Sequence, residues 1–278
     1  MGLPHYDLHC HSTASDGALS PIELLELAKN NNIEVLALTD HDTVAGVKVL
    51  QAENPAEIKI ITGAELTCLW NGRVIHIVGL GVNLESDDLK SYLANLSDLR
   101  IERSKKIAQQ LISMGLPDVF EQAKQFAGQG SIGRPHFARA LREQGAVANE
   151  QQAFKKYLGI GKKGDVKMAW PELSETVGVI KAAGGIAVLA HPTKYKMTFT
   201  KLRLVIADFV GCGGEAIEVS YPGVTPDHHY HLLRIAKENN LLLSAGSDFH
   251  APSQGWTDLG KYPPIKFEGQ HVLERLLN

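Results

Sequence analysis

The sequence feature that most constrains this chain is a short run near its start, in which His9 and His11 are followed by Asp16. In an extended strand alternate side chains share a face, so both imidazoles would point the same way, about 6–7 Å apart. Two imidazoles placed like this, followed by a small-residue turn with a carboxylate, have the geometry of a metal site. A half-buried strand whose histidines are satisfied by hydrogen bonds accounts for the pair equally well. The remainder of the chain must distinguish the two interpretations.

Further metal-type residues stand in or just after other predicted strands. Apolar runs predict these strands at residues 35–39, 59–62, 74–78, 186–190, 216–219 and 241–245. With the opening run, the chain presents nine candidate metal ligands, which are His9, His11, Asp16, His41, Glu65, His76, His191, Asp248 and His250. Taken singly, each has an ordinary alternative, such as a helix cap, a satisfied core histidine or a turn. Chance does not readily account for the whole set.

The alternation of strands and helices predicts the fold class. Short strands that are apolar on both faces and alternate with helices indicate a parallel sheet covered on both sides. About seven such units predict an α/β protein whose sheet closes into a TIM-like barrel, with the candidate ligands on the rim where active sites lie. An open doubly wound sheet is the alternative, but no phosphate-binding glycine fingerprint follows the first strand.

A long helical segment divides the predicted barrel in sequence. Residues 86–170 are predicted to be mainly helical, so we assign residues 1–85 and 171–278 to a metal-binding barrel and residues 86–170 to an insertion that contributes to substrate binding. The formal net charge is −3, yet residues 98–170 carry 13 Lys+Arg against 7 Asp+Glu. A basic segment suits an anionic substrate and an acidic body suits cations, although a solvated surface explains part of the imbalance.

Cysteine usage and hydropathy indicate the compartment. Cys10, Cys68 and Cys212 are an odd, scattered set, which suits a reducing cytoplasm better than a disulfide framework. No apolar run approaches the roughly 20 residues of a membrane span, and the N-terminus lacks a signal-peptide pattern. We therefore expect a cytoplasmic protein with no membrane association and no obligate protein partner.

Nine candidate ligands exceed the needs of one ion, because zinc, manganese and iron sites in hydrolases use roughly three to five protein ligands each. A cluster of three ions that shares the carboxylate of Glu65 would use the whole set. Such a cluster lowers the pKa of a bridging water and neutralises charge on a phosphoryl group.

Several segments together resemble a known family. These segments are DLHCHSTASDG, LTDHDTVAG, GAEL, IHIVGLG, GGIAVLAHP and SAGSDFH. They are similar to the PHP (polymerase and histidinol phosphatase) family, and within it to the branch of nucleoside 3′,5′-bisphosphate phosphatases, which includes enzymes with 5′-to-3′ exoribonuclease activity. The resemblance implies a distorted (β/α)7 barrel and three divalent metal ions, most often Mn²⁺, with Zn²⁺, Fe²⁺ or Mg²⁺ as alternatives.

The resemblance also implies how the ligands are shared among the ions. The three implied groups are His9, His11, Glu65 and Asp248; Asp16, His41 and His250; and Glu65, His76 and His191. Every position of the family pattern holds a ligand-type residue. The implied nucleophile is a metal-bridging hydroxide that attacks a phosphomonoester in line.

The implied substrates are nucleotides or short RNA. We expect hydrolysis of the 3′-phosphate of nucleoside 3′,5′-bisphosphates, such as pAp to AMP, and also expect 5′-to-3′ exoribonuclease activity on short or 5′-monophosphorylated RNA. A histidinol-phosphatase-like phosphomonoesterase is one alternative. A zinc amidohydrolase is another, but we find no lysine placed for carbamylation. A non-catalytic metal-binding module of a polymerase is disfavoured by the complete ligand set.

The predicted insertion supplies candidate phosphate-binding residues at the start of a helix. Pro135 is predicted at its first position, which leaves free backbone N–H groups at the positive end of the helix dipole. Arg134 and His136 stand beside this end, and we expect them to bind a phosphate together with the helix N–H groups. An ordinary capped helix with a surface arginine is the alternative.

Two more arginines are candidates, and one loop departs from the family. Arg100 and Arg103 share a helix face and resemble the substrate arginines of the branch, whereas a solvated face is the alternative. Residues 161–165 read GKKGD where the branch commonly reads GKPAY, so no contact is assigned to this loop. The remaining histidines are predicted to be surface residues, namely His5, His228, His229, His231 and His271.

Overall fold

A seven-stranded sheet forms the centre of the computed structural model, which describes residues 3–53, 57–128, 130–252, 258–265 and 269–278. The strands neighbour one another in chain order and are β1 (Tyr6–Cys10), β2 (Val35–Leu38), β3 (Lys59–Trp70), β4 (Arg73–Leu80), β5 (Ile186–Leu189), β6 (Ala216–Ser220) and β7 (Leu242–Ala245). A parallel bridge between Cys10 and Phe249 joins the two edges. The sheet is therefore a nearly closed barrel, which confirms the predicted distorted seven-unit α/β barrel.

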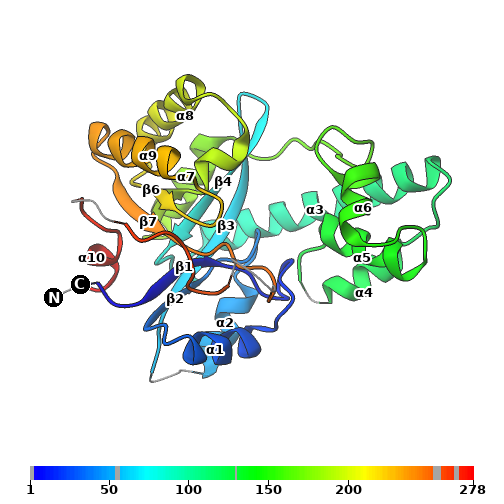
Figure 1. Ribbon diagram of the computed structural model, residues 1–278, viewed down its shortest axis with the longest axis horizontal. Helices are drawn as coiled ribbons and strands as arrows, with labels where there is room; N and C mark the ends of the chain where they lie inside the picture. Colours follow the sequence, from blue (N-terminus) through cyan, green and yellow to red (C-terminus); the bar gives the residue numbers. More distant parts are fainter. Residues whose placement is uncertain (1–2, 54–56, 129, 253–257, 266–268) are drawn as a thin grey trace.

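Helices surround the barrel, as Figure 1 shows. They are α1 (Pro21–Asn30), α2 (Ala45–Glu53), α7 (Leu173–Ala182), α8 (Phe199–Gly211), α9 (Pro226–Glu238) and the short α10 (Leu273–Leu276). Helix α1 begins where the sequence predicts, because Ser20 and Glu23 form a reciprocal capping box and Pro21 occupies the first position. Among the described residues, no helix is long and apolar enough to cross a membrane.

Strand β4 corrects the prediction of a parallel sheet, because it runs antiparallel to both β3 and β5. Its connection to β3 is the two-residue turn Asn71-Gly72, whose φ angles are +49° and +71°. This is the conformation of a tight hairpin turn, and two residues are too few for the crossover that parallel strands require. The Asn-Gly pair is a hairpin signal in the sequence, but the regular succession of apolar runs favoured a wholly parallel sheet instead.

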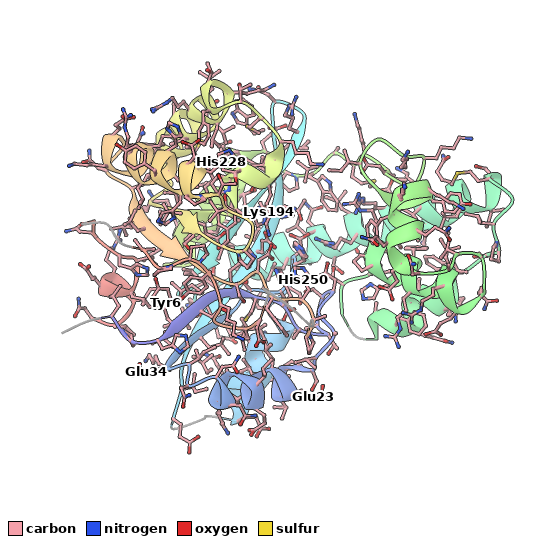
Figure 2. The ribbon with its side chains drawn as sticks, in the orientation of Figure 1. Tyr6, Glu23, Glu34, Lys194, His228 and His250 are labelled. Atoms are coloured by element: carbon pink, nitrogen blue, oxygen red, sulfur yellow. The ribbon has the colours of Figure 1, made fainter. Side chains whose placement is uncertain are left out.

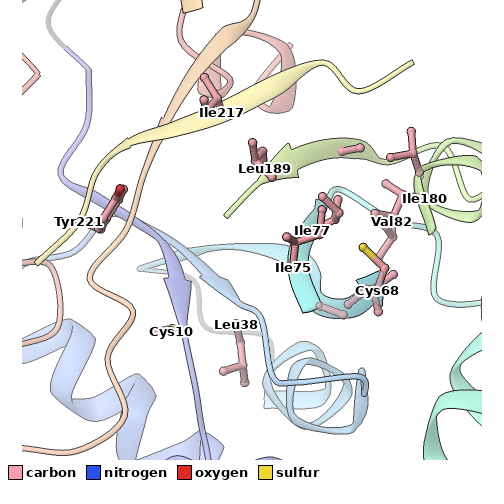
Figure 3. Close-up of a cluster of buried hydrophobic side chains, with 14 of the residues drawn as sticks. Cys10, Leu38, Cys68, Ile75, Ile77, Val82, Ile180, Leu189, Ile217 and Tyr221 are labelled. Carbon is pink, nitrogen blue, oxygen red and sulfur yellow. The ribbon is translucent and has the colours of Figure 1, made fainter. Parts of the chain in front are cut away.

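The strand faces bury two different apolar clusters. One contains residues from all seven strands, including Leu8, Ala37 and Val188, and fills the barrel interior. The other includes Leu36 and Leu189 from the opposite faces and packs the strands against the helices; part of it is shown in Figure 3. Both faces are thus apolar, as expected for strands covered on both sides.

The insertion lies to one side of the barrel (Figure 1). Its elements are α3 (Asp87–Ser113), α4 (Phe120–Ala127), α5 (Arg134–Glu143), α6 (Glu150–Ala153) and the π-helix η1 (Phe154–Leu158). They surround a third apolar cluster that includes Leu111, Phe137 and Leu141. Helix α3 joins the two parts, because Leu96 packs in the barrel cluster and Leu111 in the insertion cluster.

One predicted surface histidine is buried. His271 is 3% exposed, and its Nε2 lies 2.8 Å from the Tyr6 hydroxyl. Burial lowers the pKa of His271 to about 4. The sequence prediction was wrong because a bridge between His271 and Leu243 brings this late segment against the barrel, a contact that no local pattern signals.

Candidate metal centre

All nine candidate ligands lie at one rim of the barrel. Their side-chain nitrogen and oxygen atoms form four overlapping groups, each within 4.8 Å: His11, Asp16, His41 and His250; His9, Glu65 and His191; His9, His11 and Asp248; and His41, Glu65 and His76. Figure 2 labels His250 on the side of the barrel that faces the insertion. The convergence comes from six separate chain segments.

Glu65 is the centre of this arrangement. Its side chain is completely buried, and five imidazole nitrogens lie near its carboxylate, with those of His76 and His191 at 2.9 and 2.7 Å from Oε1, and those of His41, His9 and His11 at 3.0, 3.3 and 3.4 Å from Oε2. Oε2 has no hydrogen-bond partner despite its burial. A buried carboxylate oxygen that faces three imidazoles without a hydrogen bond has the surroundings of a shared metal ligand.

The hairpin explains how a residue in the middle of a strand reaches the rim. Strand β2 pairs with β3 only as far as Thr62, whereas β3 extends to Trp70. The part of β3 beyond Thr62 pairs with β4. His76 pairs with Thr67, two residues beyond Glu65. A mid-strand histidine on the antiparallel partner therefore stands beside ligands that follow the ends of parallel strands.

Other ligand-type atoms at the rim also lack hydrogen-bond partners. These buried atoms are Nδ1 of His11, His41 and His191 and Oδ1 of Asp16. An unsatisfied buried polar atom typically costs about 1–3 kcal/mol, so several in one place call for a common partner. Imidazole nitrogens and carboxylate oxygens are ligands for divalent cations such as zinc, manganese and iron. The donor set therefore fits metal binding.

A hydrogen-bonded turn positions Asp16. Its carboxylate lies 3.3 Å from His250 Nε2 and 3.9 Å from His41 Nε2. The turn that carries it is held by buried Asp40, which accepts hydrogen bonds from the Ser12 N–H, the Ser12 hydroxyl and the Ser15 hydroxyl at 2.7–2.8 Å. The position of Asp16 thus depends on a second carboxylate that lies outside the ligand groups.

The charges of the rim favour cation binding. Burial alone would raise the pKa of Glu65, but the imidazoles of His41 and His76 outweigh it and hold the pKa well below its usual range. Burial would also raise the pKa of Asp16, but the imidazoles of His41 and His250 outweigh it, so the pKa of Asp16 is likewise well below its usual range.

Burial lowers the pKa of His41 well below its ordinary value. For His9 and His250 burial acts in the same direction, but the neighbouring carboxylates outweigh it, so the pKa of His9 is raised well above its ordinary value and that of His250 to about 9. Ionised carboxylates bind metals directly, and imidazoles release their protons when they do so.

Two candidate ligands have strained backbones. His191 and Asp248 have φ angles of +28° and +48°, in the left-handed region that non-glycine residues rarely adopt. The Asp248 N–H donates to the His9 carbonyl at 2.7 Å, and this hydrogen bond holds the strained backbone of Asp248 in place. Gly246 permits this close approach, because a Cβ at that position would lie 2.4 Å from the His9 Cβ.

The structure adds residues that the sequence interpretation missed. Glu218, in β6, contacts His9 and His191, and a charged residue within an otherwise apolar strand was the available signal. Lys194 follows His191 and forms an ion pair with Asp248. The Tyr195 hydroxyl accepts a hydrogen bond from the His76 N–H at 3.0 Å and donates to the Ala190 carbonyl at 2.7 Å.

The arginines of α3 do not form the solvated face that was the alternative. Arg100 donates to Asp42 Oδ2 at 2.5 Å and to the Thr67 hydroxyl at 3.1 Å, so it ties the insertion to the barrel rim. Arg103 donates to the Val166 carbonyl. Burial, together with the positive charges of Arg134 and Arg100, lowers the pKa of Arg103 to about 10. Three guanidinium groups therefore lie within electrostatic range of one another.

Arg134 is the first residue of α5, one position earlier than predicted for the helix start, and Pro135 follows it. Its Nη1 donates to the Leu158 carbonyl at 3.1 Å and to Asp165 at 3.2 Å, so it is anchored to the loop of residues 159–165. Burial lowers the pKa of Arg134, while Asp165 and Asp16 act in the opposite direction.

His136 caps its own helix. The Gly133 N–H donates to His136 Nδ1 at 3.0 Å, and burial lowers the pKa of the ring. A neutral imidazole that accepts through Nδ1 carries its proton on Nε2. This ring can therefore cap α5 and still offer one N–H donor. The Ser131 N–H bonds to the Ala14 carbonyl at 3.0 Å, which brings the segment before α5 against the turn that carries Asp16.

Comparisons with known proteins identify the family of this chain. A family model described as the PHP domain matches residues 7–166. The chain is 45% identical to a 5′-3′ exoribonuclease of Haemophilus influenzae, over 92% of this chain and 93% of that protein. It is 37% identical to a 3′,5′-nucleoside bisphosphate phosphatase of Chromobacterium violaceum, over 95% and 94% of the two chains. A solved structure from that organism, described as an amidohydrolase with bound sulfate and no metal, matches with a TM-score of 0.91 and 35% identity over 98% and 96% of the two chains. This chain therefore belongs to the PHP domain family.

Proposed function

We propose that this protein is a metal-dependent phosphoesterase that acts on nucleoside 3′,5′-bisphosphates and on the 5′ end of RNA. The observation that carries the proposal is the placement of the basic insertion against the rim with its nine ligand-type residues: Arg100 pairs with Asp42, and the Ser131 N–H bonds to the turn that carries Asp16. The names of the two full-length relatives, an exoribonuclease and a bisphosphate phosphatase, support the same substrates.

The ligand groups are proposed to hold three divalent ions, with manganese as the expected metal. When bound, such ions supply a water of lowered pKa and positive charge against the oxygens of a phosphoryl group. The chain's own contribution is to hold the ligands in place. Glu65 belongs to two of the ligand groups, one with His9 and His191 and one with His41 and His76. The hydrogen bonds to Asp40 fix the turn that carries Asp16.

The insertion is proposed to bind the phosphate that is not cleaved. Arg134 can offer the guanidinium nitrogens that Asp165 does not occupy, and His136 can offer its Nε2–H. Charge-assisted contacts to phosphate are stronger than neutral ones, and a guanidinium can make two at once. Arg100 and Arg103 add further positive charge, and the hydrogen bonds of Arg100 to Asp42 and Arg103 to Val166 also fix the position of the insertion.

A specific feature favours RNA as a substrate beside mononucleotides. Residues 155–167 contain five lysines, all exposed: Lys155, Lys156, Lys162, Lys163 and Lys167. None of them has an ion-pair partner among the described residues. Asp165, within this segment, binds Arg134 and also accepts from the Gly161 N–H at 2.9 Å. The lysines therefore lie in a segment that contacts Arg134, and we expect the nucleotides behind a 5′ end to run along it.

The direct test of the function is a comparison of substrates. We expect the manganese-loaded protein to release phosphate from 3′,5′-bisphosphoadenosine and mononucleotides from 5′-phosphorylated RNA, with slower turnover of histidinol phosphate. Phosphate release and gel analysis of labelled RNA measure these rates. Preference for histidinol phosphate would instead favour the histidinol-phosphatase-like alternative, and inactivity on all three would contradict the proposal.

We expect protein produced with ample manganese to contain close to three ions per chain by elemental analysis. His41→Ala and Asp248→Asn should each reduce the metal content and lower turnover by about 100-fold or more, since each removes a different ligand. Circular dichroism should show that both variants remain folded, and His228→Ala, on α9 and outside the ligand groups, is the matched control. A single ion with full activity would refute the three-ion assignment.

Arg134→Ala tests the binding of the second phosphate. A charge-assisted phosphate contact is worth about 1.5–3 kcal/mol, or roughly 10- to 150-fold in kcat/KM. This loss is expected for 3′,5′-bisphosphoadenosine but not for p-nitrophenyl phosphate, which has no second phosphate. Arg139→Ala, on the exposed side of the same helix, is the control. Equal losses on both substrates would mean that Arg134 serves the reacting phosphate or the fold.

Reversing two charges of the lysine segment separates RNA from mononucleotides. We expect Lys162→Glu with Lys163→Glu to lower kcat/KM on a 5′-phosphorylated RNA by about 10-fold and to reduce its salt dependence, because fewer phosphates are contacted. Hydrolysis of 3′,5′-bisphosphoadenosine should be nearly unchanged. The control is Lys48→Glu with Lys237→Glu, two exposed lysines on barrel helices. An equal effect of the control pair would show that only net charge matters.

A further inference from the structure

Glu218 is a buried carboxylate that belongs to none of the ligand groups. It lies in the middle of β6, is 1% exposed, and belongs to a strand whose five residues are all buried. Its Oε1 lies 2.6 Å from His9 Nδ1, and its Oε2 accepts a hydrogen bond from the His191 N–H, also at 2.6 Å. Each oxygen thus has one donor, and the two donors belong to two different candidate ligands.

The contact with His9 determines which ring nitrogen can bind a metal. When Nδ1 donates its proton to Glu218, Nε2 of the neutral ring carries the lone pair. That Nε2 points into the candidate centre, 3.3 Å from Glu65 Oε2 and 3.5 Å from Asp248 Oδ1. A carboxylate behind a ligating histidine fixes the tautomer and the orientation of the ring and makes the ligand more basic.

The contact with His191 acts on the backbone. This residue has the strained φ angle of +28°, and such a conformation persists only where its surroundings impose it. The hydrogen bond from its N–H to Glu218 is one such constraint, and the Pro192 that follows is another. The His191 ring can then reach Glu65 Oε1, 2.7 Å from its Nε2.

We propose that Glu218 is a positioning residue. It holds the ring of His9 and the backbone of His191 in the orientations that metal binding requires, without contacting the metal itself. The inference rests on the proposed metal centre. It goes beyond the nine ligands, because it identifies the residue that couples β1, which carries His9, to the end of β5, which precedes His191.

Glu218→Gln is the informative change because it keeps the shape and removes one acceptor. The glutamine has one carbonyl oxygen and one NH₂ group, so it can accept from only one of the two donors. If the oxygen faces the His191 N–H, the NH₂ faces His9 and favours the tautomer with the proton on Nε2, which cannot bind a metal. If the oxygen faces His9, the His191 N–H loses its acceptor.

The test measures zinc binding to the metal-free full-length protein by competition with a chromophoric chelator, independent of any activity. We expect Glu218→Gln to weaken the binding of at least one ion by about 10- to 100-fold. Histidine ¹⁵N shifts of the zinc-loaded protein should show a change at His9. Glu215→Gln is the matched control, since this half-buried carboxylate next to β6 pairs with Arg275 instead. Thermal unfolding of the metal-free proteins identifies loss of folding.

Glu218→Asp provides a second measurement if the glutamine variant does not fold. Its carboxylate is one methylene shorter and cannot reach both donors, so weaker zinc binding is again expected. Wild-type affinity in either folded variant, or an equal loss in Glu215→Gln, would overturn the proposal. If the wild-type protein itself bound no zinc or manganese, the proposed metal centre would fail; if it bound them and Glu218→Gln did so equally well, only the role of Glu218 would fail.

Discussion

Five imidazole nitrogens within 3.4 Å of one buried carboxylate form the interaction on which the rest of the centre depends. Glu65 cannot be solvated, and its Oε2 has no hydrogen-bond partner. A charge buried in this way is stable only when opposite charges or metal ions surround it. The five histidines lie in or just after four strands, β1, β2, β4 and β5, and they depend on Glu65 as much as it depends on them. Divalent ions would satisfy both.

The hairpin between β3 and β4 makes this concentration of ligands possible. A purely parallel barrel places ligands at or just after the carboxyl ends of its strands, as His9 and His11 are placed here. Here β3 extends beyond its neighbour β2, and the antiparallel β4 returns along it, so Glu65 and His76 project from within strands. Two residues, Asn71 and Gly72, allow this arrangement because both adopt positive φ angles at the turn.

The insertion is placed by polar contacts as much as by apolar packing. Arg100 joins α3 to Asp42 in the loop after β2, and the Ser131 N–H bonds to the turn that carries Asp16. Buried ion pairs add little net stability but fix geometry. The same arginines that would attract a phosphate thus also set the distance between the insertion and the metal-type rim.

The sequence by itself predicted the α/β barrel, which the structure confirms, because strand alternation and helix caps are local properties. Residue chemistry is local too, and it singled out nine ligand-type residues that the structure brings to one rim. The direction of β4 was signalled by Asn71-Gly72 but was obscured by the alternation of apolar runs. The sequence could not determine the burial of His271 or the contact between Glu218 and His9, since each depends on a partner more than 200 positions away. Only the tertiary structure showed that Arg100 pairs with Asp42 and that His136 caps its helix while keeping one donor free. The physical reason is that a side chain's hydrogen-bond partner is decided by which segments the fold brings together, and residue spacing along the chain does not encode it.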